Sequence, residues 1–168
     1  AHRLDKITSG LLLVARNKPA AQQLGKLFES HAIKKTYIAL TDHKPSKKQG
    51  AITGDMQRTR DGNWKLLHSK NNPAITRFTS HSLAPNLRLF ILQPQTGRTH
   101  QLRVMMRALG SPIIGDLRYG GTAADRGYLH AQRLQFDWNG EAIDILNTFD
   151  TGALFIQFSD SINGYQNA

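Results

Sequence analysis

Residues 2–10 have the sequence HRLDKITSG, and residues 11–15 continue as the apolar run LLLVA. Turn residues and a glycine just before such a run predict a tight loop that feeds a strand at residues 11–15. Asp5 lies in this loop among His2, Arg3 and Lys6. Cationic neighbours keep a carboxylate ionised, which suits a nucleophile or a charge stabiliser. The alternative is a surface aspartate that pairs with its basic neighbours beside a core strand.

The length and charge of the chain limit its possible partners. Its 168 residues indicate one domain, which we place at 1–168. Lys and Arg number 22 against 12 for Asp and Glu, so the net charge is +10, which favours RNA or DNA as partner. No stretch is apolar enough to span a bilayer, so we expect no membrane partner. The absence of cysteine excludes disulfides and fits a cytoplasmic location.

The hydrophobic periodicity predicts an α+β domain. Helices are expected at residues 19–31 and 99–109, and a hairpin is expected at residues 51–68 with its turn at 61–63. Strands are expected at residues 34–41, 74–83, 87–93, 142–146 and 153–158. Together these elements predict a mixed, mainly antiparallel sheet with flanking helices.

Two further patterns could carry chemistry. The basic residues within 34–77 are interleaved with turns and with Tyr37 and Trp64, which suits contacts to a nucleic-acid backbone with aromatic stacking. The alternative for this pattern is a solvated basic surface without a partner. In the second pattern, QTGRTHQ at residues 95–101 precedes a helix, and Arg98 there could meet a phosphate or hold Asp5. The alternative is that Arg98 caps the loop while Thr96 or Thr99 caps the helix.

Metal and cofactor motifs are missing from the sequence. The histidines are scattered, and none forms the His-x-x-x-His pair of zinc proteases. No glycine-rich phosphate loop is present either. We therefore expect no metal site.

Several segments in order resemble the motifs of the RluA-type RNA pseudouridine synthases. They are HRLDKITSGLLLVA at 2–15, KKTYIAL at 34–40, GRTHQLRV at 97–104, SPIIGDLRYGG at 111–121 and YLHAQRL at 128–134. The resemblance implies the pseudouridine synthase catalytic fold. It also implies isomerisation of uridine to pseudouridine in ribosomal or transfer RNA, with RNA as the partner, without cofactor or metal, by a chain that we expect to be monomeric.

The resemblance also implies roles for individual residues. Asp5 matches the catalytic carboxylate, Tyr37 the tyrosine that stacks on the target base and assists proton removal, and Arg98 the arginine that pairs with the aspartate. The substrate-binding residues that it implies are Arg3, which helps to fill the space of the flipped base, Leu129, which lines the pocket, and Thr99 and His100.

One departure from the family pattern leaves alternatives open. Members of the family usually carry a preceding segment with a strand and an Asn-Lys-Pro phrase, whereas this chain begins at Ala1-His2. We therefore expect either a short variant or an N-terminally truncated fragment. The alternative function is a non-catalytic RNA-binding or RNA-remodelling module with a vestigial synthase site. A basic structural protein of the ribosome is a third possibility.

Overall fold

The computed structural model describes residues 2–166, and a seven-stranded sheet forms its centre. The strand order is β1-β8-β2-β7-β6-β3, and β9 pairs with β8. The strands are β1 (Thr8–Gly10), β2 (Lys34–Thr41), β3 (Gln49–Gly54), β6 (Ala74–Ala84), β7 (Leu87–Pro94), β8 (Leu129–Trp138) and β9 (Glu141–Leu146). β1 pairs with β8 in parallel, and the other pairs of this sheet are antiparallel. The predicted α+β fold with a mixed, mainly antiparallel sheet is confirmed.

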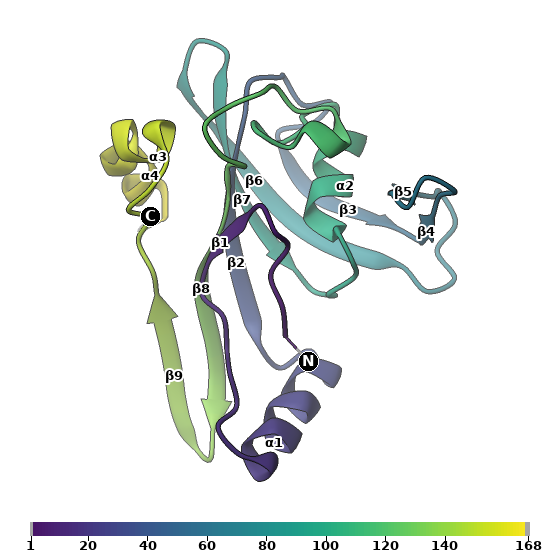
Figure 1. Cartoon of the computed structure of the whole chain (residues 1–168), viewed down its shortest axis with the longest axis vertical. Helices are drawn as coiled ribbons and strands as arrows, with labels where there is room; N and C mark the ends of the chain where they lie inside the picture. Colours follow the sequence, from purple (N-terminus) through teal and green to yellow (C-terminus); the bar gives the residue numbers. More distant parts are fainter. Residues whose placement is uncertain (1, 167–168) are drawn as a thin grey trace.

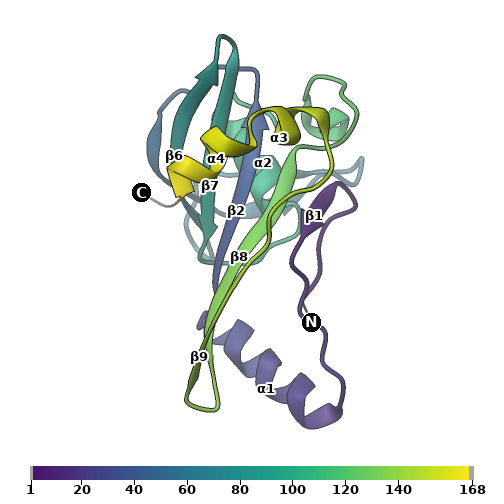
Figure 2. The ribbon, with the colours of Figure 1, turned by 90° about the vertical axis from the view of Figure 1, so that its left-hand side faces the viewer.

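Helices cover both faces of this sheet. They are α1 (Lys18–Glu29), α2 (Gln101–Ala108), the 3-10 helix η1 (Leu117–Tyr119), α3 (Ala153–Gln157) and α4 (Ser159–Gln166). Figures 1 and 2 show α2 on one face, and α3 with α4 on the other. α1 lies at one end, where Gln23 donates a hydrogen bond of 2.8 Å to Asn139 in the β8–β9 turn.

The central strand β2 is buried on both faces. Its residues Ile38, Ala39 and Leu40 are fully buried because β8 and β7 flank the strand and helices cover it above and below. Met105 of α2 packs into the core, as does Phe155 of α3, and both are also fully buried. This rigid centre holds the residues at the ends of β1 and β2 in fixed positions.

The predicted strand at residues 11–15 is wrong. The strand that forms is β1, which ends at Gly10, and Leu12 and Val14 beyond it are 49% and 75% exposed. β1 occupies the edge of β8 from Leu129 to Ala131, and β9 occupies the same edge from residue 133 onward. The apolar run therefore finds no free strand edge with which to pair.

The predicted strand at residues 153–158 is also wrong, because this segment forms α3. A short apolar run does not distinguish a strand from a buried helix. Contacts from a distant loop decide the outcome, since the Asp125 carboxylate accepts a hydrogen bond of 2.9 Å from Ala153 N. The Tyr128 hydroxyl accepts another of 3.0 Å from Leu154 N. These bonds satisfy N–H groups of the first helical turn that have no partner within the helix.

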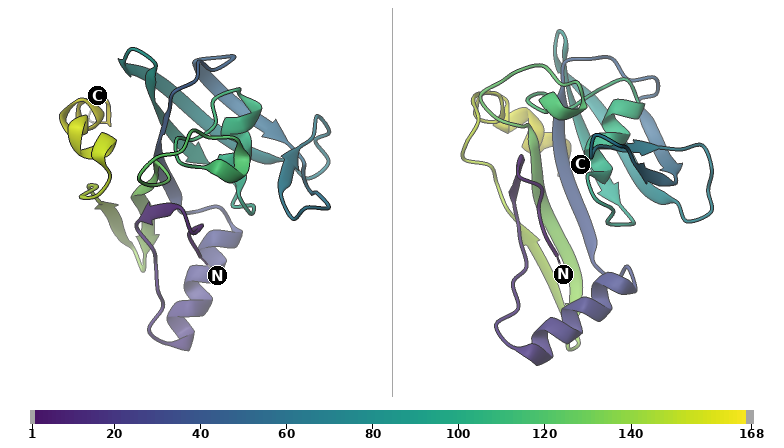
Figure 3. Two further views of the ribbon diagram at one scale, coloured as in Figure 1. Left: turned by 45° about the horizontal axis from the view of Figure 1, so that its top comes forward. Right: turned by 45° about the vertical axis from the view of Figure 1, so that its right-hand side comes forward.

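The predicted hairpin at residues 51–68 is only partly present. β4 (Met56–Arg58) and β5 (Trp64–Leu66) form a separate two-stranded sheet around the predicted turn, whereas β3 pairs with β6. Figure 3 shows this small sheet beside α2. The Tyr119 hydroxyl accepts a hydrogen bond of 3.1 Å from Trp64 N and so ties the hairpin to η1.

Candidate active site

The pairing of β1, β8 and β2 brings distant parts of the chain together. Thr8 is opposite Leu129, and Leu129 is opposite Ala39, two residues beyond Tyr37. Thr8 N donates a hydrogen bond of 2.9 Å to Asp5 O, so Asp5 starts the turn that enters β1. Asp5, Leu129 and Tyr37 therefore lie at one place, although more than 120 residues separate the first two.

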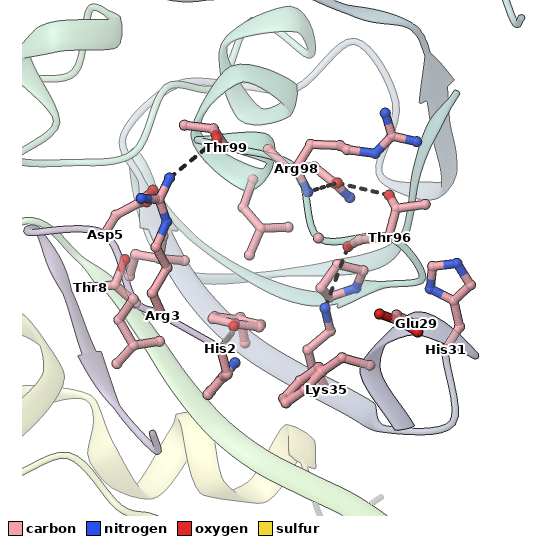
Figure 4. Close-up of a pocket in the computed structure, with 18 residues that line it drawn as sticks. His2, Arg3, Asp5, Thr8, Glu29, His31, Lys35, Thr96, Arg98 and Thr99 are labelled. Atoms are coloured by element: carbon pink, nitrogen blue, oxygen red, sulfur yellow. Dashed lines mark hydrogen bonds between the residues drawn. The ribbon is translucent and has the colours of Figure 1, made fainter. Parts of the chain in front are cut away.

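A cavity of about 500 Å³ opens at this place (Figure 4). Most of the residues predicted for the site line it, namely Arg3, Asp5, Tyr37, Arg98, Thr99 and Leu129. His100 is not among the lining residues. Its Nδ1 lies 2.7 Å from the Tyr119 hydroxyl, so its side chain belongs to the contact between α2 and η1.

The ion-pair partner of Asp5 is Arg103. Nη1 of Arg103 lies 3.7 Å from Oδ2 of Asp5. The other nitrogens of this guanidinium are held by Asp116, with hydrogen bonds of 2.9 Å from Nε and 2.9 Å from Nη2. The side chains of Arg103 and Asp116 are 6% and 1% exposed, whereas that of Asp5 is 23% exposed. Asp116 therefore fixes the guanidinium, and the carboxylate of Asp5 stays accessible from the cavity.

The predicted ion pair between Asp5 and Arg98 is not formed. Arg98 directs its Nη2 to Oδ1 of Asn72 at 2.8 Å, and its backbone N donates a hydrogen bond of 3.0 Å to the Gln101 side chain. Arg103 takes this place because α2 begins at Gln101, so that Arg103 lies in the first turn of the helix, beside Asp5. Arg98 precedes that turn, and its guanidinium points toward Asn72.

Burial and neighbouring charges set the protonation states of Arg103 and Tyr37. Burial alone would lower the pKa of Arg103, but the hydrogen bond and charge of Asp116, together with the charge of Asp5, raise it. The guanidinium therefore stays charged between two carboxylates. Burial, and next the negative charge of Asp5, raise the pKa of Tyr37 to about 12. Tyr37 consequently carries its proton at neutral pH.

Arg3 and Thr99 meet at the edge of the cavity. Nη2 of Arg3 donates a hydrogen bond of 3.3 Å to Oγ1 of Thr99 (Figure 4). Arg3 is exposed, so its guanidinium is free to exchange this contact for one to a ligand. These positions agree with a substrate-contacting role, which stays a prediction.

Sequence reasoning missed three residues of this site, Lys35, Arg103 and Asp116. Arg103 lies in the same GRTHQLRV motif as Arg98, five residues further along, and this shared motif was the available signal. Asp116 lies in the SPIIGDLRYGG motif, and its contact with Arg103 spans 13 residues of sequence. Lys35 is two residues before Tyr37, which places both on one side of β2.

The part of the chain that the structure describes shows neither a metal-binding cluster nor a membrane-spanning helix. Within residues 2–166, no group of three or more His, Asp or Glu side chains is placed to hold a metal ion. Across that range, no helix combines the length and the apolar character needed to cross a membrane.

Comparisons with known proteins identify the family to which the chain is similar. The family model described as RNA pseudouridylate synthase matches residues 1–108. A Haemophilus influenzae protein named as an RNA pseudouridine synthase is 55% identical over 158 residues, or 93% of this chain and 70% of that protein. Ribosomal large subunit pseudouridine synthase C of Rickettsia conorii is 42% identical over 123 residues, or 71% of this chain and 41% of that protein.

Solved structures show the same arrangement of elements. Human RNA pseudouridylate synthase domain containing 1 superposes with a TM-score of 0.74 at 31% identity, over 87% of this chain and 66% of that one. Human RNA pseudouridylate synthase domain containing 4 gives a TM-score of 0.74 at 26% identity, over 96% of this chain and 74% of that one. The chain thus spans about two thirds to three quarters of these human chains and 41% of the Rickettsia relative.

Proposed function

The chain belongs to the RNA pseudouridylate synthase family, and from this membership we propose that it isomerises uridine to pseudouridine in RNA with Asp5 as the catalytic carboxylate. In this reaction the bond between N1 of uracil and C1′ of ribose breaks, and a bond between C5 and C1′ forms. C5 loses its hydrogen to solvent and N1 takes up a proton. The product is an isomer of the substrate, so no oxidant or second substrate is consumed.

The observation that carries the proposal is the position of Asp5. Its carboxylate reaches the cavity beside a buried guanidinium that Asp116 holds from the other side. A carboxylate held beside a fixed cation can attack a carbon or accept a proton. Attack at C1′ of the sugar, attack at C6 of the base and deprotonation at C2′ are all compatible with this geometry.

Tyr37 supplies the second part of the proposed chemistry. Its ring lines the cavity with Leu129, and the two side chains offer an apolar surface on which a flipped base can stack. The negative charge of Asp5 contributes to the high pKa of Tyr37. If Asp5 becomes an ester with the sugar, this contribution disappears and the hydroxyl becomes a stronger acid. The hydroxyl proton is then lost to solvent more readily, and the phenolate that forms can accept the proton from C5 after the glycosidic bond has broken.

The RNA target is proposed from the relatives and the charge. The net charge of +10 favours a polyanion. The Rickettsia relative carries ribosomal large subunit in its name, so large-subunit ribosomal RNA is the first target to test, with transfer RNA second. The cytoplasmic location and the monomeric state stay predictions.

Tritium release tests this function directly. Large-subunit ribosomal RNA and a transfer RNA pool, both transcribed with [5-³H]uridine, are incubated with the chain and with its Asp5→Asn variant. We expect release by the wild-type chain, and none by the variant at equal RNA binding. RNA binding without release by the wild-type chain would instead identify a binding module with a vestigial site.

A further inference from the structure

The side chain of Lys35 places a positive charge in the cavity. The proposed chemistry assigns no role to this charge. It lies on β2 next to Lys34 and two residues before Tyr37. Because side chains alternate along a strand, Lys35 and Tyr37 face the cavity, whereas Lys34 points the other way. The structure agrees, since Lys35 and Tyr37 both line the cavity and Lys34 does not.

The ammonium of Lys35 has few partners within the protein. Its Nζ donates to Thr96 O at 3.5 Å, a long distance for a hydrogen bond. Among residues 2–166 no carboxylate forms an ion pair with it. A lysine ammonium has three donors, so donors remain for a ligand. Burial lowers the pKa of Lys35 because it disfavours the charged ammonium, and an anion beside Nζ would favour the charge again.

The position of Nζ is defined by the wall of the cavity. A Cβ placed on Gly97 would lie 3.4 Å from Nζ, so the ammonium lies against the backbone of Thr96 and Gly97. In Figure 4 the Lys35 side chain lies toward Glu29 and His31, and Asp5 lies on the opposite side of the cavity. The negative charge of Asp5 influences Tyr37, whereas burial is the cause of the shift at Lys35. The cavity therefore has the Asp5 carboxylate at one end, and the Lys35 ammonium with the Glu29 carboxylate at the other.

We propose, on the basis of the proposed function, that Lys35 binds a backbone phosphate of the RNA at the target uridine or at its neighbour. A lysine ammonium is a compact point charge that suits phosphate. Residues two apart on a strand are about 6.6 Å apart, so a base that stacks on Tyr37 can keep its own phosphate within reach of the long Lys35 side chain. The contact would set how deep the nucleotide enters relative to Asp5.

The experiment compares Lys35→Met with Lys34→Met as a matched control, because each removes one charge from neighbouring positions on opposite sides of β2. Binding of both variants and the wild-type chain to the unmodified ribosomal transcript is measured across a range of salt concentrations. We expect Lys35→Met to bind at least about tenfold more weakly and to reduce the salt slope by about 0.7 to 0.9. Lys34→Met should keep the wild-type slope.

The outcomes separate this inference from the proposed function. An unchanged slope in Lys35→Met would overturn the phosphate contact, and so would an equal loss in both variants. A lower kcat of Lys35→Met at an unchanged salt slope would also overturn the phosphate contact, because this result would indicate that Lys35 contacts the uncharged base. Failure of the wild-type chain to release tritium would contradict the proposed function but not the phosphate contact, since the salt comparison needs only RNA binding. Thermal unfolding checks each variant, and Lys35→Gln replaces Lys35→Met if the latter does not fold.

Discussion

Oδ2 of Asp5 lies 3.7 Å from Nη1 of Arg103, and Asp116 bonds the Nε–Nη2 edge of the same guanidinium. The two carboxylates therefore play different parts. Asp116 is buried and doubly hydrogen-bonded, so it orients Arg103, whereas Asp5 makes the longer contact and keeps oxygen atoms available for a substrate. This arrangement explains how one helix can hold a reactive carboxylate that precedes it by nearly 100 residues.

The first prediction separates Arg103 from Arg98. Lysine in place of Arg103 keeps the charge but cannot make the bidentate contact with Asp116. We expect Arg103→Lys to lower the rate of tritium release by at least about 100-fold and the free energy of unfolding by about 1–3 kcal/mol. Single-turnover assays and urea unfolding measure the two effects.

Arg98→Lys is the matched control for this prediction. Its guanidinium bonds to Asn72 and not to Asp5. We expect a change in RNA affinity of less than about tenfold and little change in the single-turnover rate. Equal rate losses in the two variants would argue against Arg103 as the partner of Asp5.

The second prediction concerns the hydroxyl of Tyr37. Tyr37→Phe keeps the aromatic ring and removes the group proposed to assist proton removal. We expect the rate of tritium release to fall by about 10² to 10⁴, with RNA affinity within a few fold of wild type. Since the pKa of Tyr37 is raised to about 12, kcat/KM should show no titration of this group up to pH ~10. A fall in affinity alone would assign Tyr37 to binding only.

The third prediction concerns the backbone at the end of β1. Gly10 has a φ of 109°, and a Cβ there would overlap the backbone carbonyl of Ala131 in β8. We expect Gly10→Ala to lower the free energy of unfolding by at least about 2 kcal/mol, because strain and the clash add. Gly25→Ala is the control, since nothing lies within 4 Å of a Cβ there. In the helix α1 it should stabilise by about 0.5–1 kcal/mol. Urea unfolding measures both variants. Equal changes in the free energy of unfolding for Gly10→Ala and Gly25→Ala would contradict the role given to Gly10.

The fourth prediction is a loss of stability in acid. Burial lowers the pKa of His130 below the ordinary 6.5, and burial also lowers the pKa of His2 and His100. As pH falls below 6.5, the unfolded chain takes up protons before the folded one does. Stability should therefore be complete above pH ~6.5 and decrease as pH falls toward the lowered pKa values.

His130→Gln tests this prediction at the most buried of the three histidines, since His130 is only 2% exposed. Urea midpoints measured at pH 7.5 and 5.5 should differ less in this variant than in the wild-type chain. The same difference in both proteins would show that His130 does not contribute to the acid sensitivity.

Much of the fold followed from local patterns. Strand β2 and helix α1 were predicted because alternation and helical periodicity are strong over their lengths. The errors fell where neighbours distant in the sequence decide the structure. Residues 153–158 form a helix because Asp125 and Tyr128 satisfy its first N–H groups.

The sequence by itself determined the family, the fold class and the position of Asp5 in a loop, because these depend on motifs and on periodicity within short stretches. Only the tertiary structure decided which arginine faces Asp5. Arg98 and Arg103 lie in one motif, and the start of α2 at Gln101 directs the first toward Asn72 and the second toward the carboxylates. Which side chains meet across the fold depends on where a helix begins and on how strands pair, and neither is fixed by local sequence.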